Sequence, residues 1–171
     1  NNKSDQRAAA ERIGHVDSLQ PPFSAVRRDV AERELPWCAE HRTGVIVYSP
    51  MLSGLLSGAF TRERAAALPP NDWRSRAVNF QGEALERNLA LVETLRAVAE
   101  RHQAAVGAVA IAWTLAWRGV TGAIVGARSP AQVDGWIGAA ALELTAADLE
   151  EITAAIRRTG AGSGPVAMPA R

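Results

Sequence analysis

Cysteine, tyrosine and lysine are nearly missing from this sequence, which has one of each among its 171 residues: Cys38, Tyr48 and Lys3. A single cysteine excludes an internal disulfide and suits a reducing compartment, so we expect a cytoplasmic protein. No cluster of histidine and cysteine has the spacing of metal ligands, and we therefore expect no metal site.

An excess of charge of either sign is also missing, because 19 Lys and Arg residues face 18 Asp and Glu residues, for a net charge of +1. This balance gives no electrostatic reason to expect a nucleic acid or a membrane as partner. No apolar run reaches the ~20 residues of a transmembrane helix, and the amino end lacks the core of a signal peptide. The chain begins at Asn1 rather than at methionine, and we expect it to be part of a longer protein.

Hydrophobic residues make up 47% of the chain, which is enough for one globular core. Their pattern predicts buried strands at 15–20, 44–48 and 120–125. It predicts helices at 4–13, 28–41 (restarted by Pro36), 82–102, 106–117, 130–139 and 145–156, with a long loop at 55–81. Strands that alternate with helices indicate an α/β fold with a parallel sheet. A doubly wound sheet and a (β/α)₈ barrel both fit, and three strands complete neither.

Polar or aromatic residues follow each predicted strand at its carboxyl end, where parallel α/β sheets bind ligands. They are Gln20 after the first strand, Tyr48, Ser49 and Ser53 after the second, and Gly126 and Arg128 after the third. Because parallel strands end at the same edge of a sheet, we expect these groups to converge on one ligand.

The chemistry of these groups predicts a nicotinamide dinucleotide that carries a 2′-phosphate. Gln20 offers an amide that can pair with a carboxamide, and Tyr48 offers a ring for stacking. Ser49, Ser53 and the backbone N–H groups of the loop around them suit the oxygens of a pyrophosphate. Arg128 brings a fixed positive charge for the extra phosphate.

Three segments resemble the aldo-keto reductase family, in the order that the family has them. They read Val-Asp-Ser-Leu-Gln-Pro-Pro-Phe-Ser (16–24), Val-Tyr-Ser-Pro-Met-Leu-Ser-Gly-Leu-Leu-Ser-Gly (47–58) and Ile-Val-Gly-Ala-Arg-Ser-Pro-Ala-Gln (124–132). The resemblance implies the carboxyl-terminal half of a (β/α)₈ TIM barrel over residues 1–159 and a flexible tail at 160–171. It also implies NADP(H) as cofactor and the NADPH-dependent reduction of a small-molecule carbonyl substrate, an aldehyde or a ketone.

The resemblance further assigns the residues that bind the cofactor. It implies that Gln20 and Asn1 hold the nicotinamide carboxamide, and that Tyr48 stacks under the nicotinamide ring. It implies pyrophosphate contacts for one set of residues and adenosine and 2′-phosphate contacts for another, namely Ser49, Met51 and Ser53, and then Gly126, Arg128 and Gln132.

The chain also departs from the family pattern at the cofactor site. Ala59 stands where many relatives have a lysine, and either Arg74 or Arg76 is expected to replace it. Gly135 and Trp136 stand where relatives often have glutamate and asparagine, which leaves the adenine contacts open.

No catalytic residue is expected in this chain. The family's proton-donating tyrosine and its Lys, Asp and His partners come from the first half of the barrel, whereas Tyr48 is already assigned and Lys3 lies near the chain start. The chain is therefore interpreted as the cofactor-binding half of a reductase. The alternatives are a non-catalytic cofactor-sensing or regulatory relative, or a truncated remnant. Exposed sheet edges predict association with the missing amino-terminal half or self-association.

Overall fold

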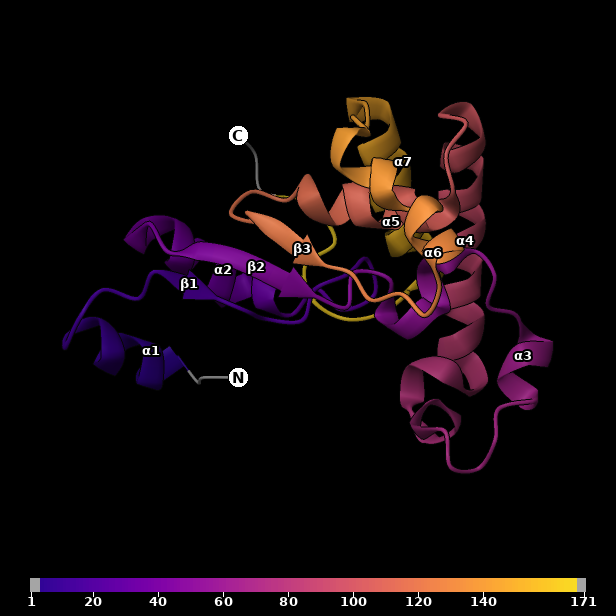
Figure 1. The fold of residues 1–171 in the computed structure, drawn as a ribbon, viewed down its shortest axis with the longest axis horizontal. Coiled ribbons are helices and arrows are strands. Elements are labelled where there is room, and N and C mark those ends of the chain that lie inside the picture. The colour runs from indigo at the N-terminus through magenta and orange to yellow at the C-terminus, as the bar shows by residue number, and fades with distance from the viewer. Residues whose placement is uncertain (1–3, 169–171) are drawn as a thin grey trace.

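A three-stranded parallel sheet with helices packed on it forms the framework of the molecule, as shown by a computed structural model that describes residues 4–168 (Figure 1). The strands are β1 (Ser18–Leu19), β2 (Gly44–Tyr48) and β3 (Gly122–Ile124). The α-helices are α1 (Ser4–Glu11), α2 (Val30–His41), α3 (Arg62–Ala66), α4 (Gly82–Arg101), α5 (Val106–Leu115), α6 (Pro130–Asp134) and α7 (Ala146–Thr159). Short 3₁₀ helices are η1 (Leu52–Ser57), η2 (Trp73–Arg76), η3 (Val78–Phe80) and η4 (Ile137–Ala141).

The sheet has one covered face and one open face. The strands pair in the order β1-β2-β3, with Leu19 opposite Val45 and Tyr48 opposite Ile124. Val45 is fully buried on the face where α2 packs on β2 and α5 packs on β3, whereas Ile46 is 36% exposed and Ile124 is 47% exposed on the other face. In a barrel, helices cover one face of the sheet only, whereas a doubly wound sheet has helices on both faces. The arrangement here is that of a barrel. The predicted α/β fold, part of a (β/α)₈ barrel, is confirmed.

The helices form because their apolar positions repeat at helical spacing and meet a common core. On α4, Leu85, Val92 and Leu95 line the buried side. The helix α5 is apolar all round and is buried from Val106 to Thr114 between α4 and the sheet. Among residues 4–168, no helix combines the length and apolar character that crossing a membrane requires.

The first predicted strand is shorter than expected. Residues 15–20 were predicted to be extended, but only Ser18–Leu19 pair with a neighbour. The physical reason is the register: β2 begins at Gly44, opposite Ser18, so no partner strand runs beside the earlier residues. Pro21 and Pro22 then end the regular pairing, because proline lacks a backbone donor.

Pro36 does not restart a helix, and the prediction of a break at this residue is wrong. The helix α2 runs without interruption from Val30 to His41 with Pro36 inside it. The lost backbone hydrogen bond falls on the exposed side, where Glu32 and Pro36 face solvent. Leu35 and Cys38 stay buried against the sheet, and this burial favours the continuous helix over the break.

The predicted helix at 130–139 is also divided into two parts. The α-helix α6 ends at Asp134, and the 3₁₀ helix η4 begins at Ile137. Gly135 and Trp136 form the junction, because the indole ring packs toward Ala108, Ile111 and Ala139 and turns the chain inward. In the same way, the predicted loop at 55–81 contains α3, η2 and η3 rather than irregular chain.

The first part of the predicted flexible tail, residues 160–168, packs against the body of the molecule. The Ser163 N–H donates to the Val26 carbonyl at 3.0 Å, and the Arg28 N–H donates to the Ser163 carbonyl at 3.0 Å. The guanidinium of Arg28, which is 2% exposed, donates to the carbonyls of Pro165 at 2.8 Å and Ala161 at 3.2 Å. Burial lowers the pKa of Arg28 to about 10, and these carbonyl partners solvate its charge.

Asp148 joins the last helix to α4 through a set of charged hydrogen bonds. Thr145 and Asp148 form a capping box at the start of α7. The buried carboxylate also accepts from Arg101 at 2.8 Å and pairs with the His102 ring at 2.8 Å. Burial alone would raise the pKa of Asp148, but the hydrogen bonds from Arg101, Thr145 and His102 outweigh it and hold the pKa well below its usual range.

These contacts predict how stability depends on pH. The Asp148 carboxylate binds a proton less readily in the folded chain than in the unfolded chain. Its contribution to the free energy of unfolding is therefore complete at neutral pH and is lost as pH falls below about 4. We expect Asp148→Asn to cost about 2 kcal/mol at pH 7 and to flatten the loss of stability between pH 7 and pH 3, as measured by urea unfolding. The exposed Asp134→Asn is the control. Equal slopes for Asp148→Asn and the unsubstituted chain would contradict this role.

Candidate functional site

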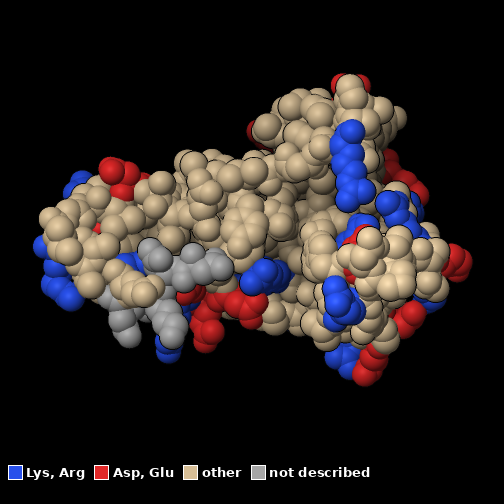
Figure 2. Space-filling view, turned by 60° about the horizontal axis from the view of Figure 1, so that its bottom comes forward, with Lys and Arg blue, Asp and Glu red and all other residues tan. Residues whose placement is uncertain are grey.

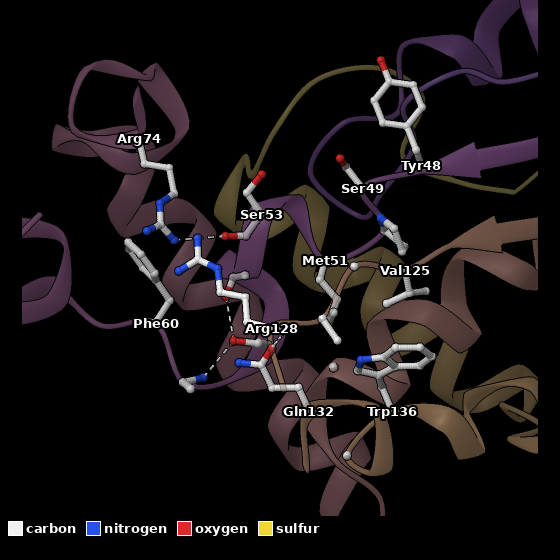
Figure 3. Close-up of a pocket in the computed structure, with 18 of the residues that line it drawn as sticks. Tyr48, Ser49, Met51, Ser53, Phe60, Arg74, Val125, Arg128, Gln132 and Trp136 are labelled. Atoms are coloured by element: carbon white, nitrogen blue, oxygen red, sulfur yellow. Dashed lines mark hydrogen bonds between the residues drawn. The ribbon is translucent and has the colours of Figure 1, made fainter. Parts of the chain in front are cut away.

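A cavity of about 860 Å³ lies at the carboxyl ends of β2 and β3. Its walls come from the loop after β2, from residues around the start of η2, and from the segment that runs from β3 through α6. Figure 3 shows Tyr48 at one end of the drawn group, Ser49, Met51 and Ser53 in the middle, and Arg74 with Arg128 at the other end. The Tyr48 ring and the guanidinium groups therefore lie on different sides of the drawn group.

The loop after β2 is built from backbone conformations that most residues avoid. Ser49, Leu52 and Ser53 have φ values of 59°, 44° and 52°, and Gly54 has 93°. Such left-handed residues cost free energy, and they persist here because Leu52, Leu55 and Leu56 anchor the loop in the core. The result is a tight coil whose polar groups face the cavity.

Several donors of this coil have no protein partner. The backbone N–H of Met51 and the hydroxyls of Ser49 and Ser53 make no hydrogen bond to any other residue within 4–168. The Met51 side chain instead packs onto α5, where a Cβ at Gly107 would come within 2.9 Å of its sulfur. Unpaired N–H and O–H groups in such a coil are chemically suited to an anion.

The loop after β3 presents Arg128 to the same cavity. The backbone N–H of Arg128 donates to the Gln132 side-chain oxygen at 2.7 Å, so Gln132 fixes the turn that carries the arginine. The Arg128 guanidinium has no hydrogen-bond or ion-pair partner among the described residues. Figure 2 shows Lys and Arg side chains beside a hollow in the surface. Asp and Glu side chains lie at other places in the same view.

The structure distinguishes between the two arginines that could replace the missing lysine. Arg74 lines the cavity, is 9% exposed, and donates to the Ser53 carbonyl at 3.3 Å. Arg76 is exposed and lies outside the cavity wall. Arg74 also pairs with Asp72 at 2.6 Å, and hydrogen bonds from Arg74 are the main cause that lowers the pKa of Asp72 to about 2. Asp72 is therefore ionised at neutral pH.

Most of the residues predicted for cofactor binding come together in this cavity. Its wall includes Tyr48, Ser49, Met51, Ser53, Gly126, Arg128 and Gln132. Gln20 is exposed and lies outside the wall, one residue before Pro21, whose carbonyl accepts the Tyr48 N–H at 3.0 Å. Asn1 lies outside the described residues.

Several wall residues were not predicted from the sequence, among them Phe60 and Asp72. Phe60 and Asp72 come from the long loop at 55–81, and neither belongs to a motif with a fixed spacing. The one signal in the sequence was the length of that loop together with its charged and aromatic residues.

Apart from the hydroxyl of Tyr48, the wall has few groups that could exchange a proton with a ligand. Among the described residues, no group of three or more His, Cys, Asp or Glu could bind a metal ion. The described wall contains no histidine or lysine, and its one carboxylate belongs to Asp72, which is ionised. Guanidinium groups stay protonated, so they bind anions but do not act as acids.

The fold is part of a parallel α/β barrel, and at the carboxyl edge of its strands lies a cavity lined by hydrogen-bond donors and arginines. Comparison with known proteins agrees, because the model of the aldo/keto reductase family matches residues 3–157. The chain therefore belongs to the aldo/keto reductase family, which generally uses nicotinamide cofactors.

Individual relatives support the same assignment. The chain is 30% identical to the NADH-specific methylglyoxal reductase of Escherichia coli over 150 residues, covering 86% of this chain and 45% of that protein. It is 36% identical to an uncharacterized oxidoreductase of Mycobacterium tuberculosis over 152 residues, covering 88% and 46%. It is 31% identical to the probable aldo-keto reductase 1 of Glycine max over 147 residues, covering 86% and 42%. The chain thus spans somewhat less than half the length of these curated relatives.

Two solved structures also resemble this chain. The glycerol dehydrogenase of Gluconobacter oxydans superposes with a TM-score of 0.87 and 26% identity, covering 99% of this chain and 51% of that chain. A thermostable aldo-keto reductase bound to epalrestat superposes with a TM-score of 0.62 at 17% identity, which supports the fold alone.

Proposed function

We propose that this chain binds NADP(H) along the cavity and is the cofactor-binding part of a reductase that converts an aldehyde or ketone to an alcohol. The observation that carries the proposal is the order of groups along the wall: a ring, unpaired N–H and O–H donors, and an unpaired guanidinium. A dinucleotide has a flat ring, a pyrophosphate and a phosphorylated ribose in that same order.

The nicotinamide end is assigned to Tyr48. Its ring stands at the end of β2 and lines the cavity, so it can stack against a flat heteroaromatic ring. Gln20 follows the neighbouring strand and is the proposed partner of the carboxamide, together with Asn1. The unpaired Met51 N–H and the Ser49 and Ser53 hydroxyls are the proposed donors to the pyrophosphate.

The adenosine end is assigned to Gly126, Arg128 and Gln132. The Arg128 guanidinium has no hydrogen-bond or ion-pair partner among the described residues, although its charge acts on Asp72. A 2′-phosphate would supply a dianion to pair with it. The Escherichia coli relative is NADH-specific by name, so family membership does not decide between the two cofactors. The preference for NADPH in this chain rests on Arg128.

Carbonyl reduction requires a hydride and a proton. The cofactor supplies the hydride when bound, whereas the wall has no positioned proton donor besides the hydroxyl of Tyr48, which is assigned to stacking. We therefore assign the proton transfer to a part of the protein beyond this chain. The open face of the sheet, with Ile46 and Ile124 exposed, is the proposed contact with that part or with a second copy.

The missing proton donor also supports a second candidate function, a cofactor-sensing protein without catalysis. The two candidates differ in the coding sequence upstream of Asn1. A strand–helix half that carries Asp, Tyr, Lys and His would support the reductase, and its absence would support the sensor.

Replacing Arg128 with alanine tests the cofactor assignment. We expect the unsubstituted chain to bind NADPH more tightly than NADH, and Arg128→Ala to lower this preference about tenfold or more, because the charge-assisted contact is worth about 1.5–3 kcal/mol. Isothermal titration with both cofactors measures the preference, and the exposed Arg76→Ala, outside the wall, is the control. An unchanged ratio of affinities in Arg128→Ala would remove its assigned role.

A further inference from the structure

The coil after β2 is held in place from outside the cavity, by the two long helices that follow it in the sequence. Its left-handed residues give it a high free energy, so the coil keeps its shape only while neighbouring elements fix it. The 3₁₀ segment η1, which contains most of the coil, packs against both α5 and α4. The contacts at its end, Gly58, therefore help to set where its N–H and O–H donors lie.

Arg96 on α4 binds the end of the coil. Its guanidinium Nη2 donates to the Gly58 carbonyl at 3.0 Å. Glu93, one turn earlier on the same helix, accepts from Arg96 Nε at 3.3 Å and so orients the guanidinium. Neither Arg96 nor Glu93 lines the cavity. Arg96 therefore contacts the coil on the side away from the ligand.

The backbone of Gly58 also packs directly on the start of α5. A Cβ at Gly58 would lie 2.7 Å from Val106 Cγ2 and 2.8 Å from Val106 Cβ, and its φ of +80° also favours glycine. Val106 is 8% exposed and β-branched, so its side chain has little freedom to move aside. Gly58 is thus confined between α4 and α5, and the bond from Arg96 fixes the direction of its carbonyl.

A chain of hydrogen bonds connects Gly58 with the donors in the cavity. The hydroxyl of Ser57, the preceding residue, donates to the Gly54 carbonyl at 2.6 Å and accepts the Ala59 N–H at 3.3 Å. The Gly54 N–H in turn donates to the Met51 carbonyl at 3.1 Å. A shift of Gly58 would therefore move Ser57 and Gly54, and with them the unpaired N–H of Met51.

From these contacts we infer that Arg96 is a positioning residue for the pyrophosphate of the cofactor, a step that rests on the proposed function. It acts through the Gly58 carbonyl and does not touch the ligand. Loss of its bond should displace the coil without unfolding the chain, because the leucines of η1 remain anchored in the core. The affinity for a pyrophosphate should then fall, while the contacts of the 2′-phosphate stay as they are.

Three ligands separate these two parts of the cofactor. NADPH contains both, adenosine 5′-diphosphate has a pyrophosphate without the 2′-phosphate, and adenosine 2′-monophosphate has the 2′-phosphate without a pyrophosphate. We expect Arg96→Met to weaken binding of NADPH and of the diphosphate about fivefold, because loss of one partly exposed charged hydrogen bond has an effect of that size. Binding of the 2′-monophosphate should stay within about twofold. Titration calorimetry measures the affinities.

Two further variants distinguish positioning from a general effect of charge. Arg96→Lys keeps a charged N–H donor and is expected to bind NADPH within about twofold of the unsubstituted chain. Arg87→Met is the matched control, because Arg87 lies on the same helix, pairs with Glu83 and is 47% exposed, against 40% for Arg96. Arg87 also lies outside the cavity wall, so its loss should leave all three affinities unchanged.

The outcomes separate the inference from the proposed function. An unchanged NADPH affinity in Arg96→Met would overturn the inference. An equal loss for NADPH and the 2′-monophosphate would overturn it as well, because such a loss reports general damage to the fold and not a displaced coil. Failure of the unsubstituted chain to bind NADPH would overturn the proposed function itself, and the role of Arg96 with it.

Discussion

Replacing Gly162 with alanine is expected to destabilise the chain by at least about 4 kcal/mol, which is exceptional for a single substitution. Gly162 has a φ of +67°, and a Cβ added there would clash with the Val26 carbonyl oxygen and lie 2.5 Å from the carbonyl carbon. The Val26 carbonyl cannot move away, because it accepts the Ser163 N–H at 3.0 Å. The segment after α7 would have to detach, and Arg28 would lose the carbonyls that solvate its buried charge.

Gly138→Ala is the matched control for this substitution. A Cβ at Gly138 meets nothing within 4 Å and needs no unusual φ, so we expect a change within about 0.5 kcal/mol. Urea unfolding measures both variants, and limited proteolysis reports whether residues 160–168 have become accessible. If Gly162→Ala unfolds at the same urea concentration as Gly138→Ala, the packing of this segment is not a source of stability.

The helices could be predicted because their signals are local. The stripe of Leu85, Val92 and Leu95 repeats at helical spacing, and the observed α4 ends within one residue of the predicted bounds. Thr145 and Asp148 stand three residues apart, which is the spacing that a capping box requires, and both of its hydrogen bonds are present. In each case the partners of a residue lie within one or two turns.

The packing of residues 160–168 and the end of α6 could not be predicted, because the residues that determine them lie far away in the sequence. Residues 160–168 look irregular in composition, yet their carbonyls are bound by Arg28, more than 130 residues earlier. The helix after Pro130 is cut short by the packing of Trp136 on α5, which no local pattern shows. Pro36 was placed by its general preference, whereas burial of Leu35 and Cys38 decides the course of α2.

The site also has one part that the sequence predicts and another part that it does not. Tyr48, Ser49 and Arg128 follow predicted strands directly, and parallel strands must end at one edge, so their meeting in one cavity could be predicted. Phe60 and Asp72 reach the cavity only because the loop at 55–81 folds back over it, held by the Arg74 bond to Ser53. The choice between Arg74 and Arg76 depended on that fold.

The 171-residue chain is expected to bind NADPH and yet to reduce no aldehyde or ketone above the uncatalysed rate. A positioned proton donor contributes roughly 10²–10⁴-fold to such a reaction, and the described wall has none besides the hydroxyl of Tyr48. Tyr48 is assigned to stacking, so Tyr48→Phe should leave NADPH affinity within about twofold, whereas Tyr48→Ala should weaken it about tenfold. Titration calorimetry and the absorbance of the reduced cofactor measure binding and turnover.

Addition of a barrel half that carries the missing acid separates binding from catalysis. If the open face around Ile46 and Ile124 is the contact surface, fusion of that half before Asn1 should restore turnover, and the fused Tyr48→Phe variant should retain most of it. A fused Tyr48→Phe variant that loses turnover while it still binds NADPH would show that Tyr48 takes part in proton transfer. Turnover by the unfused chain, abolished in Tyr48→Phe, would lead to the same conclusion, because Tyr48 is the only tyrosine in the sequence.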